Sequence, residues 1–86
     1  MDIRWSSEKN NEIKNLRGVS FEQLLKSRFI GIEKNKRKPH QRLILFEYKK
    51  YVWVVPYVQG EGRYFLKTAF PSRKHTKKYL GGIDDD

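Results

Sequence analysis

Two apolar runs in the middle of the chain constrain its fold more than any other feature. Residues 43–46 read Leu-Ile-Leu-Phe and residues 52–55 read Val-Trp-Val-Val. The dipeptide Lys-Lys at 49–50 separates the segments 42–48 and 51–58 that contain these runs. Short apolar runs around so short a break predict an antiparallel hairpin, with strands over 42–48 and 51–58. Because each strand is apolar on both faces, the sequence predicts a sheet that is covered on both sides.

Capping and turn residues indicate the ends of the other elements. Ser20 and Gln23 have the spacing of a capping box, and Gly18 is suited to end a preceding helix in the left-handed conformation. Pro56 lacks a ladder donor and is expected at an edge, an end or a bulge. The predicted elements are an extended entry at 3–5, a helix from Ser6 or Ser7 to Arg17, a helix from Ser20 that ends near Lys26 to Arg28, strands at 29–33, 42–48, 51–58 and 63–70, and a helix from Ser72 to Leu80.

These elements predict one α+β domain over residues 1–83, with two N-terminal helices, a four-stranded, mainly antiparallel curled sheet and a C-terminal helix. Three Asp residues at 84–86 are expected to form a disordered acidic tail. No apolar run approaches the roughly 18 residues that cross a bilayer, and the first residues lack the form of a signal peptide. From these two features we expect a cytoplasmic protein, and the absence of Cys fits a reducing compartment, although many secreted proteins also lack Cys.

The positive charge is concentrated in the second half of the chain. The whole sequence has 19 Lys and Arg against 10 Asp and Glu, but residues 36–83 hold twelve of the cations and two of the acids. Such a field attracts polyanions, so the candidate partners are nucleic acid, an acidic protein or an anionic membrane. A membrane fits least, because no basic stretch also has a broad apolar helical face.

Several classes of enzyme are excluded by the residues present. The sequence has no Gly-rich phosphate loop, no Gly-x-Ser-x-Gly, no Cys nucleophile and no His-Glu-x-x-His. Glu33, Glu47 and Glu61 are scattered among Lys and Arg, whereas a two-metal nuclease needs clustered carboxylates. We therefore expect neither a metal nor a cofactor.

The remaining candidate site is a set of cations suited to phosphate. Arg73, Lys74 and His75 occupy the first turn of the last predicted helix, where the free N–H groups already favour an anion. RNA cleavage without a metal needs a base, an acid and charge stabilisation, and His40 or His75 could transfer the protons, although a Lys or Tyr with a shifted pKa is also possible. The candidate catalytic residues are Arg73, Lys74, His75 and His40, and the candidate RNA-binding cations are Arg42, Arg63, Lys67 and Lys77.

Five segments in order also resemble a known family. They are Trp-Ser-Ser-Glu-Lys-Asn at 5–10, Arg-Gly-Val-Ser-Phe-Glu at 17–22, Gln-Arg at 41–42, Tyr-Val-Trp-Val-Val-Pro-Tyr at 51–57 and Lys-Thr-Ala-Phe-Pro-Ser-Arg-Lys at 67–74. Their order and spacing resemble BrnT-type toxins of bacterial type II toxin–antitoxin systems. The resemblance implies a RelE-like fold and a cytoplasmic, metal-independent endoribonuclease that inhibits translation.

The resemblance also implies a partner and site residues. The partner would be a cognate antitoxin, commonly with a ribbon-helix-helix part, so that the complex would bind promoter DNA. Motif matching assigns Arg42, Ser72, Arg73 and Lys74 to the RNA site. Ser6 and the basic segment 36–40 stand where the family has acidic residues, so no role of a carboxylate is carried over.

Two other functions remain open at the level of sequence. A non-catalytic module could bind nucleic acid through the same cations, with strong salt dependence and no cleavage. A pure interaction protein could instead use its basic face to receive an acidic protein, and would leave RNA both unbound and intact.

Overall fold

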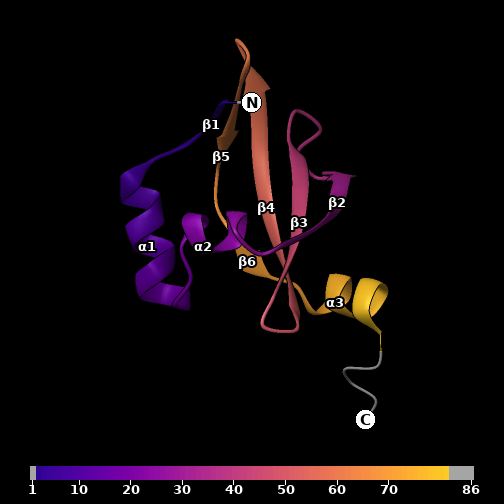
Figure 1. Cartoon of the computed structure of the whole chain (residues 1–86). Helices are drawn as coiled ribbons and strands as arrows, with labels where there is room; N and C mark the ends of the chain where they lie inside the picture. The colour runs from indigo at the N-terminus through magenta and orange to yellow at the C-terminus, as the bar shows by residue number, and fades with distance from the viewer. Residues whose placement is uncertain (1, 82–86) are drawn as a thin grey trace.

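A six-stranded mixed sheet with helices on both faces is formed by residues 2–81, which are the residues that this computed structural model describes (Figure 1). The strand order is β1-β5-β4-β3-β2, and β6 pairs with β4 beside β5. The elements are β1 (Asp2–Trp5), α1 (Ser7–Arg17), α2 (Phe21–Leu25), β2 (Arg28–Lys34), β3 (Arg42–Tyr48), β4 (Tyr51–Gly60), β5 (Arg63–Leu66), β6 (Phe70–Pro71) and α3 (Arg73–Leu80). The predicted acidic tail at 84–86 lies outside the described residues.

The α+β class is confirmed, but the predicted RelE-like arrangement of two N-terminal helices and a four-stranded sheet is wrong. The chain begins with a strand, because β1 pairs in parallel with β5 and places Ile3 opposite Tyr64. The helices follow this first strand. The strand β1 has four residues, and its partner β5 lies about sixty positions further along the chain. Nothing in the neighbouring sequence indicates such a pairing, so the sequence predicts only an extended entry.

The predicted strand over 63–70 is two strands, and Pro56 accounts for the break. Pro56 lies inside the central strand β4, not at an edge or an end, and its carbonyl accepts a hydrogen bond of 2.8 Å from the Lys67 N–H. The N and C=O of one strand residue point to the same side, so the nitrogen of Pro56 also faces this side but has no proton to donate. Pairing of β4 with β5 therefore stops at Tyr57, and pairing of β4 with β6 starts at Val54. Residues 55 and 56 of β4 belong to neither ladder.

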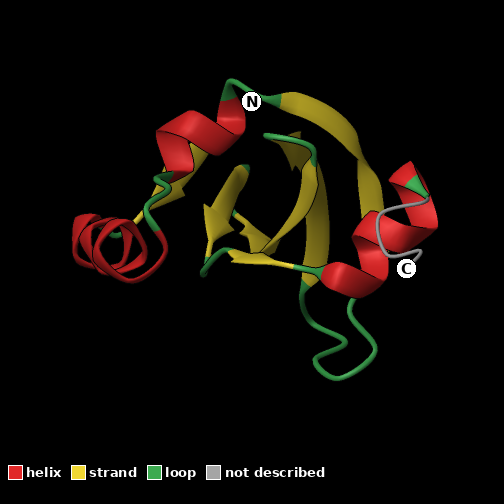
Figure 2. Cartoon of the chain, turned by 90° about the horizontal axis from the view of Figure 1, so that it is seen from below, coloured by secondary structure: helices red, strands yellow, loops and turns green. Residues whose placement is uncertain are grey.

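Both faces of the sheet are covered, as the apolar runs predicted (Figure 2). On one face α1 and α2 contribute Ile13, Phe21 and Leu24 to a core with Ile44, Phe46, Trp53 and Val55. On the opposite face Leu80 of α3 packs with Leu43 on a cluster of Leu45, Val52 and Val54.

None of the helices described within residues 2–81 is long and apolar enough to cross a membrane.

The predicted caps of the first two helices are confirmed. Ser6 accepts from the Lys9 N–H, Gly18 ends α1 at φ 74°, and Ser20 forms the capping box with Gln23. Buried Asn10 then joins the two helices, because its amide accepts from the Phe21 N–H at 2.8 Å and donates to Glu22 at 2.8 Å. These bonds hold α1 and α2 together over the face of the sheet opposite α3.

Thr76 anchors α3 to the sheet. Its fully buried hydroxyl accepts a hydrogen bond of 2.8 Å from the Val52 N–H and donates one of 2.6 Å to the carbonyl of Ser72. We expect Thr76→Val to lower the free energy of unfolding by about 1–3 kcal/mol, because a buried N–H loses its acceptor. Urea denaturation measures this, with Thr76→Ser as the variant that keeps the hydroxyl. A Thr76→Val protein as stable as the wild type would contradict this role.

Candidate functional site

A carboxylate on β2 and an imidazole on α3 meet on the face that α3 covers. Glu33 Oε1 lies 3.0 Å from His75 Nε2, and Glu33 Oε2 accepts hydrogen bonds from Lys78 at 3.0 Å and from the Tyr79 hydroxyl. The side chains of His75 and Glu33 are only 15% and 22% exposed. The pair is thus largely sheltered from bulk water, but a ligand can still reach the exposed fraction of each side chain.

A β-bulge in β2 turns Glu33 towards α3. The pairing of β2 with β3 shifts by one residue between Phe29 and Gly31, and Glu33 therefore lies opposite Leu43. Residues opposite each other in adjacent strands share a face of the sheet, and Leu43 packs on the face of α3. Without the bulge Glu33 would lie opposite Arg42, on the other face.

The surroundings of Glu33 keep it ionised. Burial by itself raises the pKa of this carboxyl, but hydrogen bonds from Tyr79, Lys78 and His75, together with the charge of the His75 ring in its protonated form, lower it more, so its pKa falls from 4.5 to about 2. The same carboxylate raises the pKa of Lys78 and of Tyr79 through its hydrogen bonds with them. A carboxylate this acidic is a poor proton acceptor, so it can orient His75 and balance charge, but it cannot serve as a base.

The contacts of His75 define which ring nitrogen is available for proton transfer. Since Glu33 is ionised, the neutral ring donates its Nε2–H to that carboxylate, and Nδ1 is then the acceptor. The Ser72 hydroxyl lies 2.6 Å from Nδ1 and donates to it, while the Ser72 oxygen accepts from the backbone N–H of His75. Ser72 thus caps α3 and at the same time occupies the proton-accepting nitrogen.

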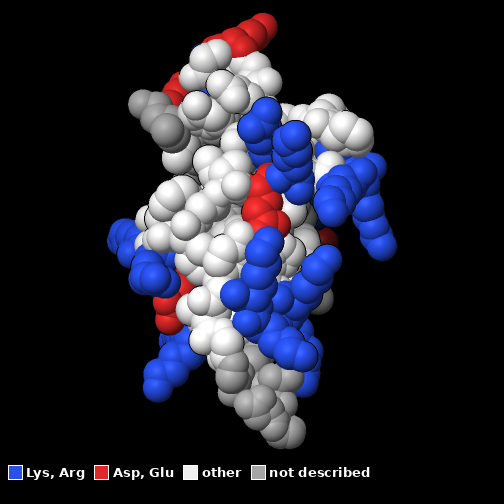
Figure 3. All heavy atoms as spheres, turned by 90° about the vertical axis from the view of Figure 1, so that its right-hand side faces the viewer, with Lys and Arg blue, Asp and Glu red and all other residues white. Residues whose placement is uncertain are grey.

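Cations surround this pair in a hollow of about 720 Å³, which we call the Glu33 hollow. Figure 3 shows Lys and Arg side chains gathered around acidic atoms on the side of the molecule that carries β2 and α3. Among residues 2–81, the carboxylate that lines the hollow is Glu33, and the cations that line it are Lys34, Lys36, Arg37, Lys74 and Lys78. Its positive charge exceeds what Glu33 can balance, so it is suited to a phosphate.

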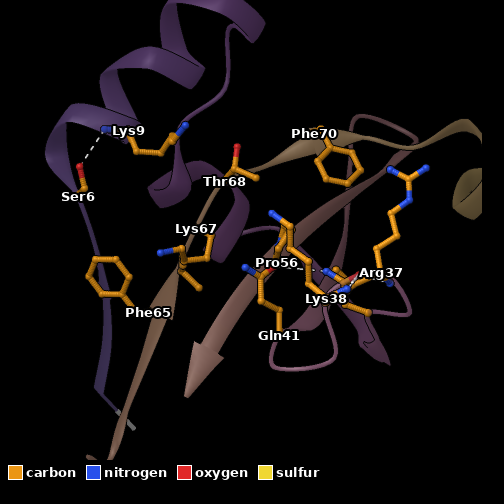
Figure 4. Close-up of a pocket in the computed structure, with 13 residues that line it drawn as sticks. Ser6, Lys9, Arg37, Lys38, Gln41, Pro56, Phe65, Lys67, Thr68 and Phe70 are labelled. Carbon is orange, nitrogen blue, oxygen red and sulfur yellow. Dashed lines mark hydrogen bonds between the residues drawn. The ribbon is translucent and has the colours of Figure 1, made fainter. Parts of the chain in front are cut away.

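A second hollow, of about 600 Å³, adjoins the first where the ladder is broken between β5 and β6 (Figure 4). We call it the β5–β6 hollow. The residues Asn35, Arg37 and Leu43 line both hollows. One extended ligand could therefore cross from one to the other past Arg37.

The structure brings some of the predicted site residues together. Lys74 and His75 line the Glu33 hollow, with Ser72 in contact with the His75 ring, and Lys67 lines the β5–β6 hollow. His40, Arg42, Arg63, Arg73 and Lys77 are all exposed, and none is among the described residues that line these two hollows.

Strand geometry explains two of the separations. Arg42 alternates with Leu43, so it lies on the sheet face of Ile44, away from α3. Arg63 Nε lies 3.2 Å from Asp2 Oδ2, at the β1 edge of the sheet. The roles predicted for Arg42 and Arg63 stay predictions, because the structure does not place these residues near His75.

Sequence reasoning did not assign Glu33 or Tyr79 to the site, and it noted Arg37 only as part of the basic segment 36–40. In the sequence Glu33 stands apart from other carboxylates and among cations, which argues against a two-metal site, yet a lone acid beside a basic segment is the signal that could identify it. Within residues 2–81, no three His, Asp or Glu side chains are grouped as a metal site. The chemistry present is therefore an oriented imidazole, a hydroxyl and several ammonium groups in one hollow.

Comparison with known proteins adds no assignment: no family model, curated protein or solved structure matches the chain. The resemblance to BrnT-type toxins rests on the five segments quoted above.

Proposed function

We propose that the chain is a metal-independent endoribonuclease and the toxin of a type II toxin–antitoxin system. One observation carries the proposal: His75 is held between Ser72 and Glu33 in a hollow that five Lys and Arg side chains line. An imidazole held in one tautomer provides proton transfer near neutral pH, and the ammonium and guanidinium groups attract and stabilise a phosphate.

The reaction is an internal transfer at phosphorus. The ribose 2′-oxygen attacks the adjacent phosphorus, a P–O2′ bond forms and the P–O5′ bond breaks, which leaves a 2′,3′-cyclic phosphate and a free 5′-hydroxyl. His75 takes the 2′-proton at Nδ1, once the Ser72 hydroxyl turns away, and Glu33 balances the charge that the ring acquires. Lys74 faces the same hollow, where it stabilises the phosphorane and donates a proton to the leaving 5′-oxygen.

The biological setting of the proposal follows from the resemblance. The toxin would act in the cytoplasm, cleave RNA and so inhibit translation until a cognate antitoxin covers its basic face. An acidic segment of that antitoxin would suit the excess of Lys and Arg around Glu33.

The test is incubation of purified protein with 3′-labelled single-stranded RNA in EDTA. We expect fragments whose new 5′ ends are hydroxyls, and no cleavage of a matched strand that has 2′-deoxyriboses throughout, because the attacking oxygen is then missing. Intact RNA after prolonged incubation would contradict the enzymatic proposal. Cleavage of the deoxyribose strand would contradict this mechanism.

A non-catalytic RNA-binding module is the second candidate, and the β5–β6 hollow favours it. Lys9, Arg37, Lys38 and Lys67 line this hollow, and no Asp or Glu is among the described residues around it. Intact RNA that migrates more slowly, with affinity that falls steeply with salt, would support this reading.

A further inference from the structure

The β5–β6 hollow presents both kinds of surface that a nucleotide needs. Its cations come from three separate parts of the chain: Lys9 from α1, Arg37 and Lys38 from the loop before β3, and Lys67 from the break after β5. Leu43, Pro56 and Phe70 supply apolar surface. A volume of about 600 Å³ is within the roughly 300–1,000 Å³ of small-molecule sites.

Phe65 is the unusual side chain of this hollow. It lies on β5 and is 39% exposed, although burial is the usual place for a large aromatic ring. Lys67 Nζ stands 5.5 Å from the centre of the ring, and Figure 4 shows the two side chains next to each other. An exposed ring beside an ammonium group offers a stacking surface for a flat base and a contact for its phosphate.

Hydrogen bonds hold the loop that carries Arg37 and Lys38 at both of its ends. The Asn35 side chain accepts from the backbone N–H groups of both residues, at 3.1 and 3.2 Å. Buried Gln41 holds the other end of the loop, because its N–H donates to the Lys38 carbonyl at 2.8 Å and its side chain accepts from Asn35 at 3.3 Å. Such preorganisation lowers the entropic cost of binding.

We propose that the β5–β6 hollow is a nucleotide subsite for single-stranded RNA, in which a base stacks on Phe65 and its phosphate contacts Lys67 and Lys38. The proposal rests on the proposed function, since the occupant is a nucleotide of the strand that His75 cleaves. Arg37 lies between the two hollows and contacts the connecting phosphate. The base must be unpaired, because a base within a duplex has no free face to stack on a side chain.

Binding of a strand that cannot be cleaved tests the subsite apart from the chemistry. The probe is fluorescein-labelled hexauridylate with 2′-O-methyl riboses, and fluorescence anisotropy in EDTA measures its Kd. We expect Phe65→Ala to raise the Kd about tenfold, within the roughly 5- to 150-fold that loss of one base stack causes, and Phe65→Trp to restore binding. Lys67→Gln should weaken binding and reduce the salt slope by about one unit.

Phe29→Ala is the matched control. Phe29 is a more exposed aromatic residue, at 58%, which packs its edge on Phe46 and lies outside both hollows. Its replacement should leave the Kd within about twofold of the wild type. Thermal unfolding of each variant shows that the comparison is made between folded proteins.

The outcomes separate this inference from the proposed function. If Phe65→Ala binds the probe like the wild type while the wild type cleaves RNA, the subsite is wrong and the ribonuclease stands. If Phe65→Ala loses binding while the wild type leaves RNA intact, the subsite stands without the chemistry. If the wild type does not bind the probe, or if polyglutamate of equal charge displaces it equally well, the stacking subsite is overturned.

Discussion

RNA cleavage in EDTA is expected to fall by about 10²- to 10⁴-fold when His75 is replaced by Gln, because general acid–base catalysis contributes about that much to such reactions. The Gln amide can still donate to Glu33 from the position that the imidazole occupies, so α3 should stay in place. Initial rates on labelled single-stranded RNA measure the loss. Expression of the wild-type chain alone should arrest bacterial growth, and His75→Gln should relieve that arrest.

His40→Gln is the matched comparison for this experiment. His40 lies exposed in the loop before β3 and is not among the described residues that line either hollow. We expect it to cleave RNA within a few-fold of the wild-type rate. The assignment of proton transfer to His75 would be reversed if His40→Gln were inactive and His75→Gln remained active. Anisotropy with the non-cleavable hexauridylate should show that both variants still bind.

The second large effect concerns acid stability, and it depends on Glu33. A carboxyl whose pKa is about 4.5 in the unfolded chain and about 2 in the folded one stabilises the fold above pH 4.5, and this contribution is lost as the pH falls from about 4.5 to 2. A difference of this size corresponds to about 3 kcal/mol. Glu33→Gln should therefore be less stable than the wild type at pH 7 and should lose less stability on acidification.

Urea denaturation at pH 7, 4.5 and 3 measures this difference. Glu47→Gln is the control, because Glu47 forms an ion pair of 2.6 Å with the exposed Arg28, and exposed pairs contribute only about 0–1 kcal/mol. If the wild type and Glu33→Gln lost equal stability between pH 4.5 and 3, the hydrogen bonds from Tyr79, Lys78 and His75 would not stabilise the ionised carboxylate as the structure indicates.

Local signals predicted the elements whose ends are set by neighbouring residues. The caps at Ser6 and Ser20, the left-handed Gly18 and the central hairpin are all present as expected. The errors concern pairing at a distance. The parallel contact of β1 with β5 joins residues about sixty positions apart, and the division of the strand at 63–70 depends on which side of β4 the nitrogen of Pro56 faces.

The candidate site could be predicted only in part for a similar reason. The cations in the first turn of α3 lie where free N–H groups favour an anion, and this local pattern identified Lys74 and His75. The face on which Glu33 lies depends on a bulge between Phe29 and Gly31, which shifts the pairing of β2 with β3 by one residue. The pattern of polar and apolar residues along β2 does not reveal this shift. The alternation of side chains along β3 places Arg42 on the opposite face, where it cannot join His75.

The separation of Glu33 and His75 along the chain has a consequence for the timing of assembly. The β3–β4 hairpin closes through neighbouring residues, whereas Glu33 and His75 are 42 residues apart. Contacts between remote segments cost more chain entropy and form late in folding. Only the complete tertiary structure therefore brings Glu33 and His75 together, and the proposed chemistry requires α3 to be docked on the sheet.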